Sequence, residues 1–267
     1  MWRLVTLAIL TLAASVASAQ DLPKVTSVNV CTDQYVMLLA DPAQVSSISA
    51  LSEDPFSSAL ADRAGAFPKN TGRAESIALE APDIVVAHDW TDPALLNMLR
   101  TIGIEVVQFP TVTALADIPA QLRRMGEVLN RRAIAEDMAT AFEARLAQFP
   151  QPGSAAPLAA FFYPNGYALG AGTLSHDILS HAGARNLSVE LGLQGGGKLA
   201  LEQVLLHQPD LLIVAPRYDG FSQSEDMTMH PALSGIPVVH SNRDWSCGTP
   251  RALDAVADVA EAIDQLR

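Results

Sequence analysis

One sequence pattern occurs twice in this chain and limits the folds that it can adopt. The pattern is a glutamate, a leucine four positions later, and a Pro-Asp pair followed by an apolar run; its copies, residues 75–86 and 202–213, lie 127 positions apart. Each copy predicts a short helix, a break at Pro-Asp and a buried strand. Solenoid repeats recur about every 20–50 residues. A repeat this widely spaced instead predicts two similarly built lobes with a ligand cleft between them.

The first 19 residues have the composition of a secretory signal peptide. Arg3 gives a basic start, residues 4–12 are almost uninterrupted apolar residues, and Ala-Ser-Ala at 17–19 forms a small-residue cleavage site. The apolar stretch is shorter than the roughly 20 residues that span a bilayer, which argues against a membrane anchor. No cysteine follows the cleavage site, so a lipid anchor is not expected either. We therefore expect a soluble mature chain that starts at Gln20 and is exported to a bacterial periplasm.

The charge of the chain argues against nucleic acid as a partner. The formal net charge is −12, and no cluster of Lys and Arg is present to neutralise phosphates. Hydrophobic residues make up 49% of the chain, which favours a well-packed globule. Aromatic residues make up only 6%, so aromatic side chains in loops become candidate ligand contacts.

Cys31 and Cys247 are the two cysteines of the chain and lie near its opposite ends. In an oxidising compartment two cysteines commonly pair, and such a disulfide would tie the two lobes together and restrict their motion. The alternative, two free or buried thiols, stays open from the sequence.

Strand-like and helical segments alternate along the chain, which predicts mostly parallel sheets built from βα units. The predicted strands are residues 25–30, 45–49, 84–86, 104–109, 158–162, 211–215 and 236–240. The predicted helices outside the repeat are residues 32–40, 93–102, 117–129, 132–149, 174–182 and 250–266. Three consecutive glycines at 195–197 predict a flexible loop.

The helix at residues 132–149 contains neither Gly nor Pro and separates the two sets of βα units. Its apolar residues fall four apart and predict one buried face, formed by Ile134, Met138, Phe142 and Leu146. The expected organisation is a signal peptide at 1–19, an N-terminal lobe at 20–130, a linker helix at 131–150 and a C-terminal lobe at 151–267.

This order of elements resembles the periplasmic substrate-binding proteins of ABC importers for iron-siderophores, haem and vitamin B12. The repeated Glu…Pro-Asp pattern and the long helix carry the resemblance, and the stretch from Asp244-Trp245 to Pro250-Arg251 is similar to the cobalamin binders in particular. The resemblance implies an α/β fold of two Rossmann-like lobes joined by a single long α-helix. It also implies a monomer without cofactor or enzymatic activity that delivers a metal chelate to a permease dimer in the inner membrane.

The resemblance gives the repeated glutamates a role. In this family one acidic residue on each lobe docks into an arginine pocket of the permease, and the matching residues here are Glu75 and Glu202. An exposed carboxylate near a helix start is tolerated by the helix and can form a charge-assisted pair with Arg on a partner. In the alternative interpretation, both are ordinary first-turn glutamates that stabilise helix N-termini.

Candidate ligand contacts lie in the loops after predicted strands, because ligands of open α/β sheets bind beyond the carboxyl ends of the strands. Loop 29–33 is one such segment, and the candidate side chains of the others are Trp90, Tyr163, Trp245, Arg217 and Tyr218. Aromatic faces suit flat, partly apolar chelates such as corrins, and Arg can pair with an anionic siderophore. Each aromatic residue could instead pack within its own lobe. The Trp245 region and the few basic candidates favour a corrinoid over a ferric siderophore.

Other functions have weaker support in the sequence. His88 and His240 end predicted strands, but the six histidines are scattered, so a bare-metal site is not favoured while an axial His or Tyr contact to haem iron stays open. A secreted hydrolase is also disfavoured, because no G-x-S-x-G motif is present. Ser175-His176-Asp177 are adjacent on a predicted helix, where their side chains point in different directions.

Overall fold

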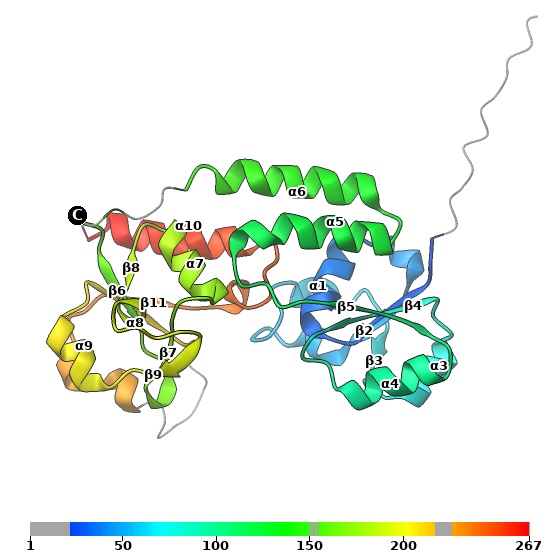
Figure 1. Cartoon of the computed structure of the whole chain (residues 1–267), viewed down its shortest axis with the longest axis horizontal. Helices are drawn as coiled ribbons and strands as arrows, with labels where there is room; N and C mark the ends of the chain where they lie inside the picture. The colour runs from blue at the N-terminus through cyan, green and yellow to red at the C-terminus, as the bar shows by residue number, and fades with distance from the viewer. Residues whose placement is uncertain (1–21, 150–152, 154, 217–225, 267) are drawn as a thin grey trace, which may run out of the picture.

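Two parallel β-sheets, one from each half of the chain, form the framework of the structure (Figure 1). The computed structural model describes residues 22–149, 153, 155–216 and 226–266, so the expected signal peptide lies outside the described residues. The first sheet has the order β3-β2-β1-β4-β5, and the second has the order β11-β10-β6-β8. All strand pairs within these two sheets are parallel. The predicted α/β fold of two lobes is therefore confirmed.

The strands of both sheets are short, and those in the centre are the most buried. In the first sheet they are β1 (Val25–Ser27), β2 (Val45–Ser49), β3 (Lys69–Asn70), β4 (Ile84–His88) and β5 (Glu105–Phe109). In the second sheet they are β6 (Leu158–Phe161), β8 (Arg185–Asn186), β10 (Leu211–Val214) and β11 (Val238–His240). A separate antiparallel pair joins β7 (Tyr167–Leu169) and β9 (Gly196–Lys198).

Helices connect most successive strands, and the last helix follows the final strand. Those of the first half are α1 (Val30–Leu39), α2 (Ala61–Ala64), α3 (Ala74–Glu80) and α4 (Pro93–Thr101). Those of the second half are α7 (Leu174–His181), α8 (Leu187–Glu190), α9 (Leu201–His207) and α10 (Ala252–Asp264). Between the halves, α5 (Ile118–Val128) and α6 (Arg132–Leu146) run side by side along one edge of the molecule (Figure 1). Within the described residues, none of these helices has the length and apolar character needed to span a bilayer.

The first predicted strand is shorter than expected. The sequence pattern predicted a strand to residue 30, but β1 ends at Ser27 and α1 begins at Val30. Asn29 caps this helix, since its side-chain oxygen accepts a hydrogen bond from the backbone N–H of Cys31 at 2.9 Å. An Asn in this position satisfies an otherwise unpaired helix N–H and so favours the helix over continued strand.

The predicted buried face of the linker helix is confirmed except at Ile134, since Phe142 is buried and Met138 and Leu146 pack partly buried against the core. The side chains of Ala135, Ala139 and Phe142 are buried, whereas Ile134 is 39% exposed. The reason is the close approach of α5: a Cβ atom at Gly126 of α5 would overlap the methyl group of Ala135. Small residues therefore make the closest contact with α5, next to the large apolar side chains of the predicted face.

The prediction of a flexible loop at the three consecutive glycines is wrong in part. Residues from Gly196 onward form β9, which pairs antiparallel with β7. Glycines are poor strand formers, and here they are tolerated because a neighbouring strand approaches closely. The sequence alone does not show that neighbour.

The two copies of the repeat have the same local structure. Helices α3 and α9 both end in a left-handed residue before the proline, at Ala81 and Gln208, each with φ of 45°. The aspartate that follows each proline then holds the next strand in place. The carboxylate of Asp83 accepts the backbone N–H of Lys24 before β1 at 2.7 Å, and that of Asp210 accepts the N–H of Leu158 in β6 at 2.8 Å. The Pro-Asp pair is thus a strand clamp as well as a helix breaker.

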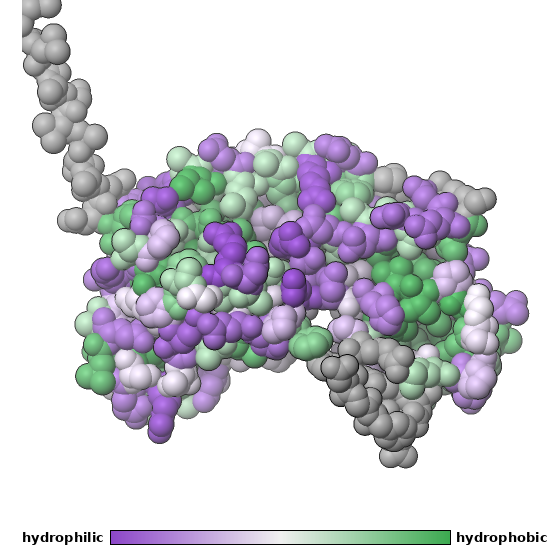
Figure 2. Space-filling view, turned by 180° about the vertical axis from the view of Figure 1, so that it is seen from behind, coloured by the Kyte–Doolittle hydropathy of each residue, from purple (hydrophilic) through white to green (hydrophobic). Residues whose placement is uncertain are grey.

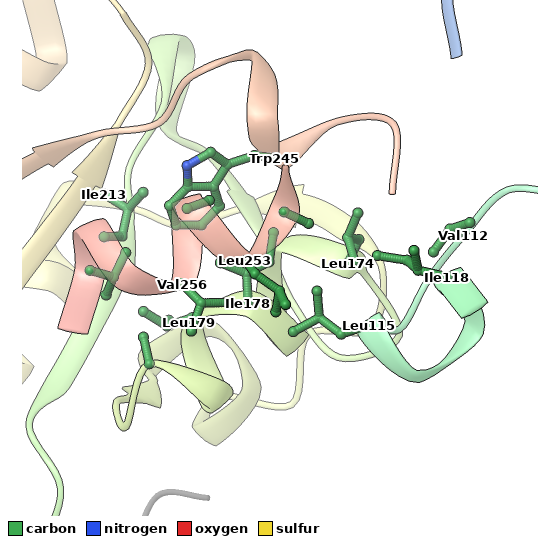
Figure 3. Close-up of a cluster of buried hydrophobic side chains, with 14 of the residues drawn as sticks. Val112, Leu115, Ile118, Leu174, Ile178, Leu179, Ile213, Trp245, Leu253 and Val256 are labelled. Atoms are coloured by element: carbon green, nitrogen blue, oxygen red, sulfur yellow. The ribbon is translucent and has the colours of Figure 1, made fainter. Parts of the chain in front are cut away.

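A continuous apolar core connects the two lobes. The cluster of buried side chains extends from the first sheet through α5 to the second sheet. Figure 3 shows Val112, Leu115 and Ile118 from the segment before and into α5 beside Leu174 and Ile178 of α7. Since protein interiors are close-packed, such a shared core resists large relative motion of the lobes.

Candidate functional site

A cavity of about 490 Å³ lies between the two lobes, at the carboxyl ends of strands from both sheets. The view from behind shows a notch between the two halves on the side away from α6 (Figure 2). The first half of the chain contributes Phe56, Thr111, Val112 and Thr113. The second half contributes Tyr163, Leu169, Gly172, Thr173, Leu174, Ser175, Ala215, Pro216, Ser241, Asn242, Trp245 and Ser246.

The wall of this cavity is polar but uncharged. None of the described residues that line it carries a charge, and eight of them offer hydroxyl or amide groups: Thr111, Thr113, Tyr163, Thr173, Ser175, Ser241, Asn242 and Ser246. Hydroxyl and amide groups both donate and accept hydrogen bonds. The cavity therefore suits a ligand that is rich in neutral polar groups.

Two aromatic residues of the second lobe, Tyr163 and Trp245, line the cavity, and both pack against the buried ring of Phe161. Phe161 of β6 makes edge-to-face contacts with Tyr163, at 5.9 Å between ring centroids, and with Trp245, at 6.0 Å. Tyr163 is hydrogen-bonded to Ser241, and burial raises the pKa of its phenol to about 12. It stays neutral at all physiological pH values and can act as a hydrogen-bond donor.

Trp245 and Trp90 have very different environments. Trp245 is only 4% exposed and packs among Ile213, Leu253 and Val256, so most of its ring serves the core while an edge reaches the cavity (Figure 3). Trp90 is 81% exposed, and its indole N–H donates to the hydroxyl of Thr111 at 2.9 Å. Trp90 is not among the residues that line the cavity, but Thr111 is, so Trp90 lies next to the lining, at the rim on the first lobe. Arg217 and Tyr218, also candidate contacts, lie outside the described residues.

Several cavity residues were not among the predicted contacts. Thr111 to Thr113 follow β5, and Ser241 and Asn242 follow β11, so the rule that ligands bind after strands applies to both loops. They were missed because they carry neither aromatic nor charged side chains. Conversely, loop 29–33 does not line the cavity, because its residues form the cap and first turn of α1.

The histidines lie in separate environments. His88 is buried at the end of β4, where desolvation lowers its pKa and its Nδ1 accepts the backbone N–H of Trp90 at 3.4 Å. His240 borders a second, smaller cavity of about 210 Å³ in the second lobe. In the part of the chain that the structure describes, no group of three His, Cys, Asp or Glu side chains is arranged to hold a metal ion.

Ser175, His176 and Asp177 make no triad. Ser175 faces the cavity, the Nδ1 of His176 lies 3.5 Å from the amide of Asn186, and the carboxylate of Asp177 accepts the backbone N–H of Leu115 at 2.6 Å. Their side chains thus point to three different partners, as expected for adjacent helical residues.

The loop between β11 and α10 crosses to the first lobe beneath the cavity. Cys247 forms a disulfide with Cys31, with their Cα atoms 4.9 Å apart. Beside it, the buried hydroxyl of Tyr35 donates to the backbone oxygen of Gly248, and a Cβ atom at Gly248 (φ +59°) would collide with Val112. The pairing that the sequence left open is thus present, and it joins the lobes at the base of the cavity.

Asp33, two residues after Cys31, is fully buried. One carboxylate oxygen accepts hydrogen bonds from the backbone and side chain of Ser49 and from the hydroxyl of Ser52, while the other oxygen has no partner among the described residues. Desolvation by burial raises the pKa of this carboxyl from 3.8 to about 6, and the serine hydrogen bonds only partly oppose the rise.

We expect Asp33 to make the protein less stable as pH rises. Its folded-state pKa lies above its unfolded one, so the folded state binds more protons between about pH 4 and 6, and about 3 kcal/mol of stability is lost as pH rises through this window. Urea unfolding of the wild type and of Asp33→Asn at pH 3 to 7 measures this effect of Asp33 on the free energy of unfolding. The wild type should lose about 3 kcal/mol more than the variant, and parallel pH profiles would show that Asp33 does not titrate there.

The repeated glutamates lie far from the cavity. Glu75 and Glu202 are exposed in the first turns of α3 and α9, and neither helix has a side-chain cap. Figure 1 places these two helices at opposite ends of the molecule, both on the side away from α6. Their positions on two separate lobes leave both carboxylates accessible to one large partner.

Comparisons with known proteins agree with this architecture. A family model described as "Periplasmic binding protein" matches residues 25–244. Two vitamin B12-binding proteins, from Pectobacterium atrosepticum and Pectobacterium carotovorum, are each 28% identical to this chain. The first match covers 204 residues, which are 72% of this chain and 72% of the relative. The second covers 200 residues, which are 72% of this chain and 71% of the relative.

Solved structures show the same fold at lower sequence identity. The periplasmic haem-binding protein RhuT from Roseiflexus matches with a TM-score of 0.73 at 20% identity, over 91% of this chain and 98% of that one. The periplasmic vitamin B12-binding protein BtuF of Vibrio cholerae matches with a TM-score of 0.66 at 19% identity, over 92% and 98%. The family resemblance predicted from the sequence is confirmed. With a family model that spans most of its length, the chain belongs to the periplasmic binding protein family.

Proposed function

We propose that this chain is the periplasmic solute-binding component of an ABC importer, and that it captures a corrinoid in the cavity between its lobes. Family membership and the two-lobed fold support the transport role. The relatives found by sequence, which are vitamin B12-binding proteins, support the corrinoid. These relatives are binding proteins, and we infer that this chain likewise catalyses nothing itself.

We infer the class of ligand from the described lining of the cavity, which holds no charged side chain. Haem and many ferric siderophores present carboxylate or other anionic groups, which are bound most favourably by Arg or Lys. A corrinoid instead carries many amide side chains, and these can pair with the hydroxyl and amide groups of residues such as Thr113, Thr173 and Asn242. The described lining therefore favours a neutral, amide-rich chelate over an anionic one.

The proposed contacts divide between the lobes. Trp90 would cover one face of the ligand from the rim of the first lobe, while Tyr163 and the edge of Trp245 would meet it from the second. Arg217 and Tyr218 remain proposed contacts on the basis of their place after β10. The lobes are assigned to residues 20–130 and 151–267, with the helix of 131–150 between them.

Capture needs little lobe movement in this arrangement. The shared core, the linker helix and the Cys31–Cys247 disulfide all join the lobes. We infer that the cleft is largely preformed and that closure on the ligand is modest. Release would then follow docking of Glu75 and Glu202 on the permease.

Titration with three chelates tests the ligand. Cyanocobalamin, haemin and ferrichrome would each be added to the mature protein, with tryptophan fluorescence as the signal, since Trp90 and Trp245 are its two tryptophans. We expect cyanocobalamin to quench the fluorescence, anionic haemin to have little effect, and ferrichrome, a smaller neutral chelate, to bind more weakly than cyanocobalamin. A specific response to haemin or ferrichrome would replace the corrinoid, and no response to any of the three would contradict the proposed function.

The contribution of the rim can be measured by calorimetry with cyanocobalamin. Trp90→Ala should weaken binding about tenfold, because a large aromatic face leaves the ligand. Trp90→Phe keeps an aromatic face and should retain most of the affinity. Equal affinity of wild type and Trp90→Ala would remove Trp90 from the proposed contacts.

A further inference from the structure

Two leucines of the repeat are unusually exposed. Among the large hydrophobic side chains of the described residues, the three most exposed are Leu79 at 89%, Trp90 at 81% and Leu206 at 72%. Trp90 borders the cavity, but the two leucines lie on α3 and α9, away from it. A single exposed leucine needs no explanation. Here the same repeat position is exposed on both lobes, which calls for a common cause.

Each leucine shares a helix face with a proposed docking glutamate. Leu79 follows Glu75 by four residues, and Leu206 follows Glu202 by four, a spacing that places side chains next to each other on a helix surface. The opposite face of each helix is turned into its lobe, where Ile77 on α3 is buried and Val204 has the same role on α9. Each lobe thus presents one carboxylate beside one apolar side chain.

The two pairs are held in the same local geometry. Both helices are seven residues long, and both end in a left-handed residue at φ of 45°. Both are then clamped to the sheet by the aspartate after the proline. The leucines are therefore presented on fixed backbone and lose little freedom when a partner covers them.

We propose that Leu79 and Leu206 are the apolar half of the permease-docking surface. Each would enter a small apolar pocket on one permease subunit, while the neighbouring glutamate pairs with a cation on the rim of that pocket. This inference rests on the proposed function. Two equivalent pairs on two lobes match the two equivalent surfaces that a symmetric permease dimer offers.

The charges beside the leucines favour the permease as the docking partner over a second copy of this chain and over a lipid surface. A second copy of this chain would bring glutamates against glutamates, on proteins of net charge −12. An anionic lipid surface would repel the same carboxylates. A partner with cations around an apolar pocket is complementary to both groups of each pair.

The two groups of a pair contribute differently to docking. Charged rim groups mainly accelerate and orient the encounter, whereas burial of apolar surface slows dissociation. Loss of one buried leucine is expected to weaken docking at least about tenfold, chiefly through faster dissociation.

Binding of the ligand-free protein to the permease encoded beside it, in nanodiscs, tests this inference. The variants are Leu79→Gln, Leu206→Gln and their combination, since Gln is polar but keeps a high helix propensity. Ile134→Gln is the matched control, because Ile134 is also an exposed aliphatic residue on a helix but lies on α6, on the opposite side. Thermal melting and cyanocobalamin affinity are measured for every variant, and nanodiscs without permease are included.

We expect each leucine variant to dissociate at least about tenfold faster, the combination faster still, and Ile134→Gln to match the wild type. Leucine variants that dock like the wild type, while Glu75→Arg and Glu202→Arg lose docking, would overturn the leucine inference and leave the proposed function intact. A wild type that does not bind the permease at all would overturn both. Equal binding to nanodiscs with and without permease, lost in the leucine variants, would assign the leucines to the lipid surface instead.

Discussion

Transport should fall to background when Glu75 and Glu202 are both replaced by Arg, while ligand affinity stays unchanged. Both carboxylates are exposed on helices far from the cavity. Reversal turns each proposed pair with a permease cation into a like-charge contact, which costs several kcal/mol, or more than about a hundredfold in affinity at each lobe. Uptake of labelled cyanocobalamin by proteoliposomes that contain the permease measures the effect, and calorimetry measures ligand binding separately.

Glu127→Arg is the control for this charge reversal. Glu127 is an exposed glutamate on α5, on the side of the molecule that carries the linker helix. It should leave uptake unchanged, which separates local docking from a general effect of net charge. If the double reversal instead weakened ligand binding and spared docking, Glu75 and Glu202 would belong to ligand recognition and the docking assignment would be wrong.

Removal of the disulfide should cost about 3–5 kcal/mol of stability. Cys31 and Cys247 are separated by 216 positions, and a link across so long a loop removes much of the conformational entropy of the unfolded chain. The measurement is urea unfolding of the protein with both cysteines replaced by Ser, compared with the wild type. Because the link lies at the base of the cavity, the same variant should also show a wider range of inter-lobe distances by spin-label spectroscopy.

Reduction of the wild type provides the matched control for the disulfide. Dithiothreitol should shift the unfolding midpoint of the wild type toward that of the double variant and leave the variant itself unchanged. The crossing loop keeps other contacts with the first lobe, including the Tyr35–Gly248 hydrogen bond and the bond from the Arg243 guanidinium to the backbone oxygen of Pro55. A loss below about 1 kcal/mol would mean that these contacts and the shared core hold the lobes without the disulfide.

The helices and strands were predictable where local patterns dominate. Strand β10 and helix α4 follow the predicted bounds closely, because an apolar run and a Pro-initiated helix closed by Gly103 are local signals. The start of α1 was placed late because the capping role of Asn29 is decided by one side-chain hydrogen bond. The exposure of Ile134 on α6 was not predicted, because the closest packing of this helix is between Ala135 and Gly126 of another helix.

The sequence indicated which loops could border the candidate site, but not most of the residues that line it. The strand-end rule directed attention to Trp90, Tyr163 and Trp245, and the structure brings the last two together around Phe161. This rule does not distinguish an exposed indole from a buried one, and the indole of Trp245 is largely buried in the core. The neutral residues that make up most of the cavity wall, such as Thr111 and Asn242, carry no sequence signal of their own because Ser, Thr and Asn are common in all loops.

The amino-acid sequence by itself determined the two-lobed plan, because the Glu…Pro-Asp repeat is a local pattern that builds the same helix, turn and strand wherever it occurs. Only the tertiary structure decided what lies between the lobes. The uncharged cavity and the crossing loop with its disulfide bring together residues as distant as Tyr35 and Gly248. Such contacts depend on how whole elements pack. The exposure of Leu79 and Leu206 likewise follows from the face that each helix buries against its own sheet.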